Sequence, residues 1–432
     1  MESLPECLGI QAPEDQTQHF WKNRRLALTA MLLSLLASSL LANLSKRRLK
    51  YLGLSLIRKA QLTQLFKRLK LPICQGYLPL TPDRANAYLG HYGEAVKITT
   101  VLDSETYVTR PPVCVNGSTL QALQPISPQI DSVVLDITHP GFSFRNNHLF
   151  DERLNVIDEG GKRFAQMPIA KQKLALPQRL KGTIAYLSNV EPTNYYHWMC
   201  RTLPLLATYQ QRFAIAEIDY FYIGNFKLSD FHLETLKRVG ISPDQILQTA
   251  CCSDRLVAAI SNRKILSGAA PINHSSYRFT QQLFAKEVQA ATPKQRIYVA
   301  RGNTTRRKVT NESAVMQVLA RHGFESVSMD GRSLLEQVRL FSQAEAVVAP
   351  HGAALTNLLF ITPGTKVIEL MPHGYVNTCF YVLTDYSQGD YFCLGGEETE
   401  QGTVAPHWRD LKIDIPKLER MCETAFASSP VP

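Results

Sequence analysis

The chain has 432 residues, of which 45% are hydrophobic and 19% charged, and its formal net charge is +10. This composition excludes an intrinsically disordered protein, and the length gives room for two domains with hydrophobic cores. A net positive charge favours binding to a nucleic acid, to an anionic membrane surface or to a phosphorylated small molecule. Because no nucleic-acid-binding motif accompanies the basic clusters, we do not expect a nucleic acid as a partner.

Residues 1–75 are predicted to be helical and basic. Within them, residues 26–44 carry no charge and are marginally long enough for one membrane span. Basic residues flank this segment on both sides, so its orientation in a membrane is not resolved. The competing interpretation is a buried helix, or a helix lying in the membrane interface. We expect membrane association through anionic lipid, to which a basic helix at residues 57–71 would contribute.

The cysteines and the sequons bear on the compartment. The nine cysteines form no CxxC pair and no spacing typical of a zinc site, and scattered thiols are typical of a reducing compartment. Sequons of the form N-x-S/T occur, among them those at Asn116, Asn273, Asn303 and Asn311. Two of them fall in the ligand-binding region predicted below, so we interpret them as chance. We therefore expect the cytoplasmic face of a membrane, or the cytoplasm if residues 26–44 are a buried helix, with a lumenal arrangement as the rival.

Residues 76–270 are predicted to form the first of two α/β domains. The part up to about residue 180 is mixed, with proline-rich breaks between short β-type runs. Beyond it, strands alternate with helices, and this alternation implies a parallel sheet. The predicted strands are residues 183–187, 220–223 and 256–260, and the predicted helices are residues 197–209 and 231–239.

Residues 271–395 repeat the alternation and are predicted to form the second domain, followed by a tail at residues 396–432. A capping box at Ser333–Glu336 predicts the start of one helix, and Gly323 predicts the end of another. The predicted strands are residues 295–300, 324–329, 346–349 and 366–370. Two successive α/β units with a break between them predict two Rossmann-like domains that face a cleft.

A first cluster of candidate ligand-binding residues opens the helix after the strand at residues 183–187. It consists of Asn194, Tyr195, Tyr196, His197 and Trp198. The cluster lies at a carboxyl end of the predicted sheet, where α/β proteins bind ligands. Aromatic faces can stack on a sugar or a base, and a histidine can act as a general base. The alternative is an aromatic core cluster that contains a hydrogen-bonded histidine.

A second cluster is the basic loop Arg301–Lys308, which follows the strand at residues 295–300. Its four cations would attract a diphosphate, and a guanidinium suits bidentate contact with phosphate. The alternative is a solvated basic loop. We expect Arg301 to be the main ligand-binding residue, followed by Arg306 and Lys308.

The third cluster lies in Ala346–Leu370, which is predicted to be a strand, a turn of small residues, a helix and a second strand. A helix that opens beside a glycine turn offers N–H groups and a positive dipole end to an anion such as a diphosphate. His351, Gly352 and Ala353 would meet its phosphates. Asn357 would bind a ribose or lock the turn. Glu369 would accept ribose hydroxyls or form a salt bridge to a loop.

The amino-acid sequences of these clusters resemble the motifs of a known protein family. The run APHGAALTNLLF followed by PGTKVIEL resembles the signature of glycosyltransferase family 61, the DUF563 group. That family includes plant xylan-decorating enzymes, animal O-linked N-acetylglucosaminyltransferases and many bacterial proteins. Tyr298–Arg301 with Arg306–Arg307 and Asn311–Glu312 is similar to its second motif, and Tyr195–Trp198 resembles its first motif in the bacterial form. The resemblance covers roughly residues 180–395.

The resemblance implies the two-domain GT-B fold and inverting transfer of a sugar from a nucleotide-sugar donor to a hydroxyl of a glycan or other acceptor. The second and third clusters would then bind the donor. We predict His197 as the base that deprotonates the acceptor, with Glu191 or Asp330 as alternatives. No D-x-D motif occurs in the sequence, so cations such as Arg301 are expected to neutralise the leaving diphosphate without metal or cofactor.

Other functions remain open at this point. A non-catalytic nucleotide-sugar or glycan-binding protein on the same fold is the main alternative. A nucleotide-dependent oxidoreductase is disfavoured because the G-x-G-x-x-G turn is missing, and Gly352 is the only glycine that the third cluster's turn provides. A basic adaptor for membranes or nucleic acids would show steep salt dependence in binding. The sequence does not identify the sugar, the nucleotide or the acceptor.

Overall fold

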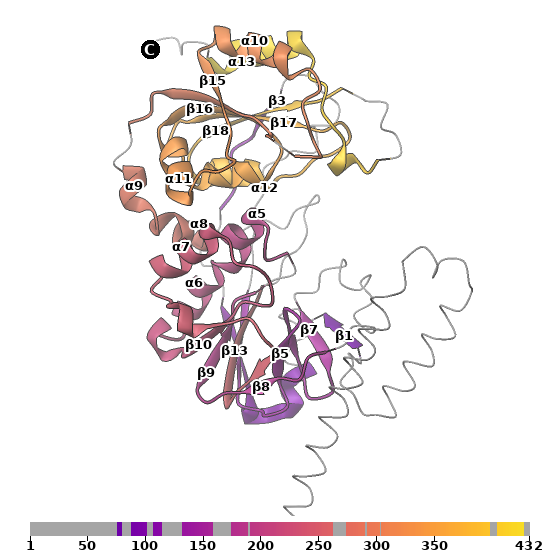
Figure 1. The fold of residues 1–432 in the computed structure, drawn as a ribbon, viewed down its shortest axis with the longest axis vertical. Helices are drawn as coiled ribbons and strands as arrows, with labels where there is room; N and C mark the ends of the chain where they lie inside the picture. Colours follow the sequence, from indigo (N-terminus) through magenta and orange to yellow (C-terminus); the bar gives the residue numbers. More distant parts are fainter. Residues whose placement is uncertain are drawn as a thin grey trace, which may run out of the picture. The chain divides into compact units, whose positions relative to one another are not determined.

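The computed structural model describes a mixed α/β protein (Figure 1). The predicted basic region at residues 1–75 and its apolar segment 26–44 lie outside the described residues. Among the described helices, none is both long and apolar enough to cross a membrane. The described residues are 76–79, 88–101, 107–114, 132–158, 174–188, 191–261, 274–289, 292–302, 304–397 and 404–426.

The first α/β sheet has the strand order β11-β10-β9-β13-β4-β2. Its four strands β11, β10, β9 and β13 are parallel, as the alternation predicts, whereas β4 and β2 add an antiparallel edge that the sequence did not reveal. The strands β4, β9, β10 and β13 are largely apolar and buried, which is typical of a sheet covered on both faces. They are β2 (Val96–Val101), β4 (Ser132–Ile137), β9 (Thr183–Tyr186), β10 (Tyr220–Tyr222), β11 (Ile246–Leu247) and β13 (Arg255–Ser261).

The helix that follows β9 carries the first cluster. Asn194 caps it, because its side-chain oxygen accepts the backbone N–H of His197. The helix begins as α5 (Tyr195–His197), widens into the π-helical turn η3 (Trp198–Thr202) and ends as α6 (Leu205–Gln210). Such π-helical turns often occur at functional sites. Further along the chain, α7 (Asp230–Arg238) ends next to Gly240, whose positive φ of 81° suits the predicted helix stop.

The second α/β sheet is entirely parallel and has the order β15-β14-β16-β17-β18-β3. Counted from β14 along the chain, its first five strands have the doubly wound order 2-1-3-4-5. The order reverses between β14 and β16, and sheets of this kind bind ligands outside the carboxyl ends at that point. The strands are β14 (Gln295–Val299), β15 (Phe324–Val327), β16 (Ala344–Pro350), β17 (Lys366–Met371), β18 (Asp390–Gly395) and β3 (Val113–Cys114).

Helices flank the second sheet on both faces (Figure 1). The capping box predicted at the start of α11 is present, since the Ser333 side chain accepts the Glu336 N–H while Glu336 reaches back to Ser333. The turn after β16 leads into the 3₁₀ helix η6 in place of the α-helix that the sequence suggests. These helices are α10 (Glu312–Arg321), α11 (Leu334–Ser342), η6 (Ala353–Phe360) and α12 (Cys379–Tyr386).

Two parts of the predicted domain division need correction. Residues 415–426, expected in a tail, form α13 (Ile415–Phe426), because Leu418, Met421 and Cys422 give it an apolar face that packs with α10 against the second sheet. Strand β3 also belongs to this sheet, although the sequence places it in the first domain. Arg110 holds the incoming segment in place with an Nε–H that donates to the buried Asp385 at 2.7 Å.

A third, mixed sheet of short strands was not predicted at all. Its order is β1-β7-β6-β5-β12-β8. The strands are two to four residues long, so they carry too little alternation to be recognised from sequence. They are β1 (Gly76–Pro79), β5 (Ser143–Arg145), β6 (His148–Phe150), β7 (Asn155–Asp158), β8 (Gln178–Arg179) and β12 (Cys251–Cys252).

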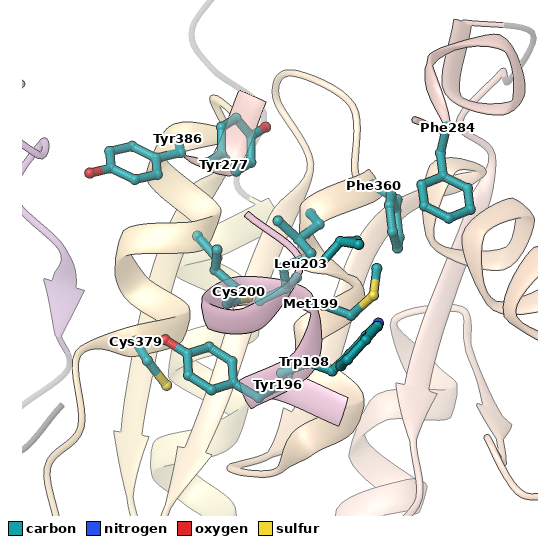
Figure 2. Packing of buried hydrophobic residues seen from close by; sticks show 14 of the residues in the cluster. Tyr196, Trp198, Met199, Cys200, Leu203, Tyr277, Phe284, Phe360, Cys379 and Tyr386 are labelled. Atoms are coloured by element: carbon teal, nitrogen blue, oxygen red, sulfur yellow. The ribbon is translucent and has the colours of Figure 1, made fainter. Parts of the chain in front are cut away.

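The helices of both α/β sheets share one hydrophobic core. Trp198, Met199 and Leu203 from the π-helical turn region are buried in the same cluster as Phe360 of η6, and Figure 2 shows these side chains gathered together. Helix α8 (His274–Gln282) and the short α9 (Ala285–Gln289) complete the connection between the sheets. Residues 72–432 accordingly form a single compact unit.

Candidate functional site

The second and third clusters meet at the point where the strand order of the second sheet reverses. The loop after β14 carries Arg301, and the turn after β16 carries Gly352. A Cβ atom built on Gly352 would overlap the Nη1 atom of Arg301, so the guanidinium lies directly against this turn. Gly352 has an extended backbone with φ near −179°. Glycine is therefore needed here for room, not to relieve backbone strain.

Two guanidinium groups in this region are partly buried without a counter-ion. The Nε atoms of Arg301 and Arg307 are buried and have no hydrogen-bond partner, and neither residue forms an ion pair with a described carboxylate. Burial lowers the pKa of Arg301 to about 10, and the nearby charges of Arg307 and Arg306 add to this effect. Burial also lowers the pKa of Arg307. Cations held together in this way attract an anion that the protein itself does not supply.

Arg307 is the cation that sequence reasoning missed. It has a positive φ of 56°, an uncommon conformation for a residue other than glycine and one that recurs at functional sites. Its charge lies within electrostatic reach of Tyr375, Cys379 and Glu369. Arg306 and Lys308, the cations of this loop that were predicted in its place, have exposed side chains at the edge of the site. No sequence signal separates three adjacent basic residues by their burial.

His351 and Glu369 form a buried pair. The His351 Nδ1 atom hydrogen-bonds to Glu369 Oε1, and the Tyr391 hydroxyl donates to Oε2 at 2.6 Å. Glu369 is 0% exposed, and both its oxygens are engaged by protein groups, which disfavours the predicted contact with ribose hydroxyls. The other predicted role, a salt bridge to a loop, would be met by the His351 turn if the imidazole is protonated. The pair fixes the His351 ring in the turn.

Asn357 locks the turn and does not contact a ribose. It is 0% exposed, and its amide donates to Gln337 Oε1 at 2.9 Å and to the Ala354 carbonyl at 3.0 Å. Its oxygen accepts the Tyr195 hydroxyl at 2.7 Å. The third cluster is thereby joined to the first one. Ala353, the first residue of η6, remains partly accessible beside Gly352.

His197 is paired with a carboxylate. Its Nε2 lies 3.0 Å from Glu191 Oε2, and its side chain is 15% exposed against 49% for Glu191. A carboxylate accepts the Nε2 proton, so in the neutral ring Nδ1 is the nitrogen that takes up a proton. A series of ring contacts connects His197 to the third cluster. Between ring centroids, the distance is 5.9 Å from His197 to Tyr196, 5.6 Å from Tyr196 to Phe380 and 5.0 Å from Phe380 to His351.

The other members of the first cluster have structural roles. Trp198 is 0% exposed, and its indole N–H donates to Thr235 at 2.8 Å, so its face cannot stack on a sugar as predicted. Tyr196 is 7% exposed and likewise packs in the core (Figure 2). Tyr195 connects to Asn357, and Asn194 caps the helix. The alternative interpretation, an aromatic core cluster with a hydrogen-bonded histidine, describes these neighbours of His197.

Arg201 is a further cation at this place. Its guanidinium lies over the Tyr196 ring, 5.6 Å from the centroid. Burial raises the pKa of the Cys379 thiol well above its usual value, Glu369 and Cys200 add to this effect, and Arg201 opposes it. Arg201 thus lies within electrostatic reach of Cys379, as Glu369 does.

The Gly352→Ala substitution is expected to weaken diphosphate binding about tenfold with little loss of stability. The added methyl group would push the Arg301 guanidinium away from the turn, and one displaced charge-assisted hydrogen bond accounts for a change of about this size. Isothermal titration with inorganic pyrophosphate measures the affinity, and thermal unfolding measures the stability. Gly364→Ala is the control for an alanine introduced at a glycine turn, because no atom lies within 4 Å of the added Cβ. The φ of 83° at Gly364 adds backbone strain that Gly352→Ala does not have. Unchanged affinity in Gly352→Ala would place the anion elsewhere.

Comparisons with known proteins agree with this site. Residues 195–368 match the family model described as Glycosyltransferase 61. The chain is 34% identical over 123 residues to protein O-linked-mannose beta-1,4-N-acetylglucosaminyltransferase 2 of Takifugu rubripes, a match that covers 27% of this chain and 20% of the relative. It is 32% identical over 100 residues to xylan glycosyltransferase MUCI21 of Arabidopsis thaliana, covering 22% and 19% of the two chains. It is also 32% identical over 62 residues to beta-1,2-xylosyltransferase RCN11 of Oryza sativa subsp. japonica, covering 14% and 12%.

These matches are local, and the family-model match falls on the site. The chain spans at most 20% of the length of the three relatives, and all three are eukaryotic. The matched residues 195–368 begin with Tyr195 and end just before Glu369, so they contain the first cluster from its second residue, the basic loop and the glycine turn. The family model and the names of the relatives together support a similarity to glycosyltransferase family 61 over residues 195–368.

Proposed function

We propose that this protein transfers a sugar from a nucleotide-sugar donor to a hydroxyl of a glycan or glycoconjugate, with inversion at the anomeric carbon. One observation carries the proposal. Arg301 and Arg307 are partly buried guanidiniums without counter-ions, and they lie where a doubly wound sheet binds ligands. A donor diphosphate is an anion whose oxygens suit bidentate contact with guanidinium groups, and it would supply the counter-ion that these two arginines lack.

The donor half of the site is proposed to work without a metal ion. The sequence has no D-x-D motif, and the arginines are able to stabilise the charge that develops on the leaving diphosphate. His351, held by Glu369, and the Gly352 turn would lie beside the phosphates. We further propose that the two α/β sheets with their helices correspond to the GT-B arrangement, and that the donor lies on the second of them.

The base is proposed to be His197. Its Nδ1 would take the proton of the acceptor hydroxyl as the oxygen attacks the anomeric carbon from the face opposite the diphosphate. The new bond joins the acceptor oxygen to the anomeric carbon, the bond from that carbon to the phosphate oxygen breaks, and the nucleoside diphosphate leaves. Glu191 would hold the Nε2 proton and stabilise the imidazolium that forms. Glu191 itself is the alternative base, whereas Asp330 lies against Gly302 in the basic loop.

The sugar, the acceptor and the location belong to the proposal as well. The names of the relatives make N-acetylglucosamine and xylose the first donor sugars to test. We propose acceptor binding by residues 76–180, and association with a membrane through residues 1–75, at its cytoplasmic face. Assignment to the bacterial branch of the family also remains a proposal.

A thermal-shift screen against nucleotide sugars tests the proposed function. We expect one donor to raise the unfolding temperature of the wild type and to have little effect on Arg301→Ala. A donor that stabilises the protein is then offered with candidate glycan acceptors, and release of the nucleoside diphosphate is measured. Binding without release or transfer would favour the non-catalytic sugar-nucleotide-binding function. Absence of any stabilisation would contradict the whole proposal.

A further inference from the structure

One tryptophan stands apart from the core. Trp408, in the 3₁₀ turn η7 (Pro406–Trp408), is 51% exposed, whereas Trp198 is fully buried. Single exposed apolar residues are common and need no explanation by themselves. Trp408 differs because a cation of the candidate site lies on it. The Arg306 guanidinium is 4.7 Å from the centroid of its ring.

The backbone holds Trp408 beside the basic loop. The Lys308 N–H donates to Asp410 Oδ1 at 2.9 Å, and the Leu411 N–H donates to the Lys308 carbonyl at 2.7 Å. Val309 and Leu411 form a parallel bridge just beyond. These contacts fasten the segment after η7 along the loop that carries Arg301 and Arg307. The position of Trp408 is therefore fixed by the same loop that supplies the diphosphate-binding cations.

Aromatic rings connect Trp408 to the glycine turn. Between ring centroids, the distance is 5.6 Å from Trp408 to His407, 5.9 Å from His407 to Tyr375 and 5.3 Å from Tyr375 to His351. On its other side, His351 is connected through Phe380 and Tyr196 to His197. His197 and Trp408 are thus the two ends of one series of ring contacts, with the proposed phosphate site at its middle.

We infer that Trp408 and Arg306 form the subsite for the nucleobase of the donor, with the base stacked on the accessible part of the indole. The inference rests on the proposed function. In a nucleotide sugar, the diphosphate separates the sugar from the nucleoside. The sugar must reach the proposed base His197 at one end of the series, so the nucleoside lies toward the other end. Stacking on an aromatic ring suits any nucleobase, and a guanidinium adds a cation–π contact.

Titration calorimetry with two probes tests the subsite. Inorganic pyrophosphate reports on the phosphate site alone, whereas UDP and GDP report on the phosphate site and the base together. For Trp408→Ala we expect the affinity for the better of the two nucleotides to fall about tenfold, with the affinity for pyrophosphate unchanged. Trp408→Phe keeps a stacking ring and should retain most of the nucleotide affinity. Leu233→Ala, which removes an exposed apolar side chain from α7, is the control.

Tryptophan fluorescence gives a second readout. A bound nucleotide should quench the emission of the wild type, and the quenching should be lost in Trp408→Phe although this variant still binds. Equal nucleotide affinity of wild type and Trp408→Ala would overturn the subsite and leave the proposed function standing. An equal loss for pyrophosphate and nucleotide would also overturn it, since Trp408 would then act through the loop. If the wild type binds neither probe, both the subsite and the proposed donor site are wrong.

Discussion

Replacing His197 with alanine is expected to lower kcat for sugar transfer by roughly a hundredfold to ten-thousandfold, the usual contribution of a positioned general base. Donor affinity should stay close to that of the wild type. The reason is geometric, because the His197 imidazole lies beyond Tyr196 and Phe380 from the proposed phosphate site. The measurement is steady-state transfer kinetics together with calorimetric binding of the donor.

Glu191→Gln separates the two candidates for the base. If His197 takes the proton, loss of the Glu191 carboxylate leaves the base in place but poorly oriented, and kcat should fall only about tenfold. If Glu191 takes the proton, Glu191→Gln should be the more damaging change. Added imidazole should partly restore transfer by His197→Ala but not by Glu191→Gln. Near-normal turnover of His197→Ala would remove His197 from the mechanism.

The sequence was informative where the structural signal is local. The capping box at Ser333–Glu336 and the helix stop at Gly323 depend on a few neighbouring residues, and both are present in the structure. The meeting of Arg301 and Gly352 was also predictable, because both follow strands of one parallel sheet. Carboxyl ends of parallel strands share an edge, so motifs that follow them come together.

The sequence was uninformative where burial decides the role of a residue. Tyr196 and Trp198 look like a sugar-stacking platform, but both side chains are buried in the shared core. Glu369 looks like a ribose acceptor, but His351 and Tyr391 saturate it. Arg307 exceeds Arg306 as a candidate ligand because its guanidinium is partly buried, whereas the Arg306 side chain is exposed. None of these outcomes follows from residue type or spacing, since each depends on long-range packing.

The double substitution of Arg301 and Arg307 by methionine is expected to lower the affinity for pyrophosphate by at least a hundredfold. Each guanidinium would contribute a charge-assisted hydrogen bond of roughly 1.5–3 kcal/mol, and every 1.4 kcal/mol is about tenfold in affinity. Lys308→Met is the matched control. It also removes a cation of this loop, but one whose side chain is exposed and whose backbone N–H is held by Asp410. Calorimetry with pyrophosphate should show a much smaller effect for this control.

The same double substitution should not destabilise the unliganded protein. In the wild type, burial disfavours the charged form of both guanidiniums, as their lowered pKa values indicate. These two partly buried charges therefore oppose folding. Replacing unpaired buried charges by an apolar side chain of similar length is therefore expected to leave the unfolding temperature unchanged or to raise it. Pyrophosphate should stabilise the wild type and have no effect on the double variant. A protein that becomes less stable while its pyrophosphate affinity is retained would show that these arginines serve the fold. Loss of binding with a gain in stability would mean that the two arginines lower the free energy of unfolding of the empty protein, and that binding of an anionic ligand offsets this effect.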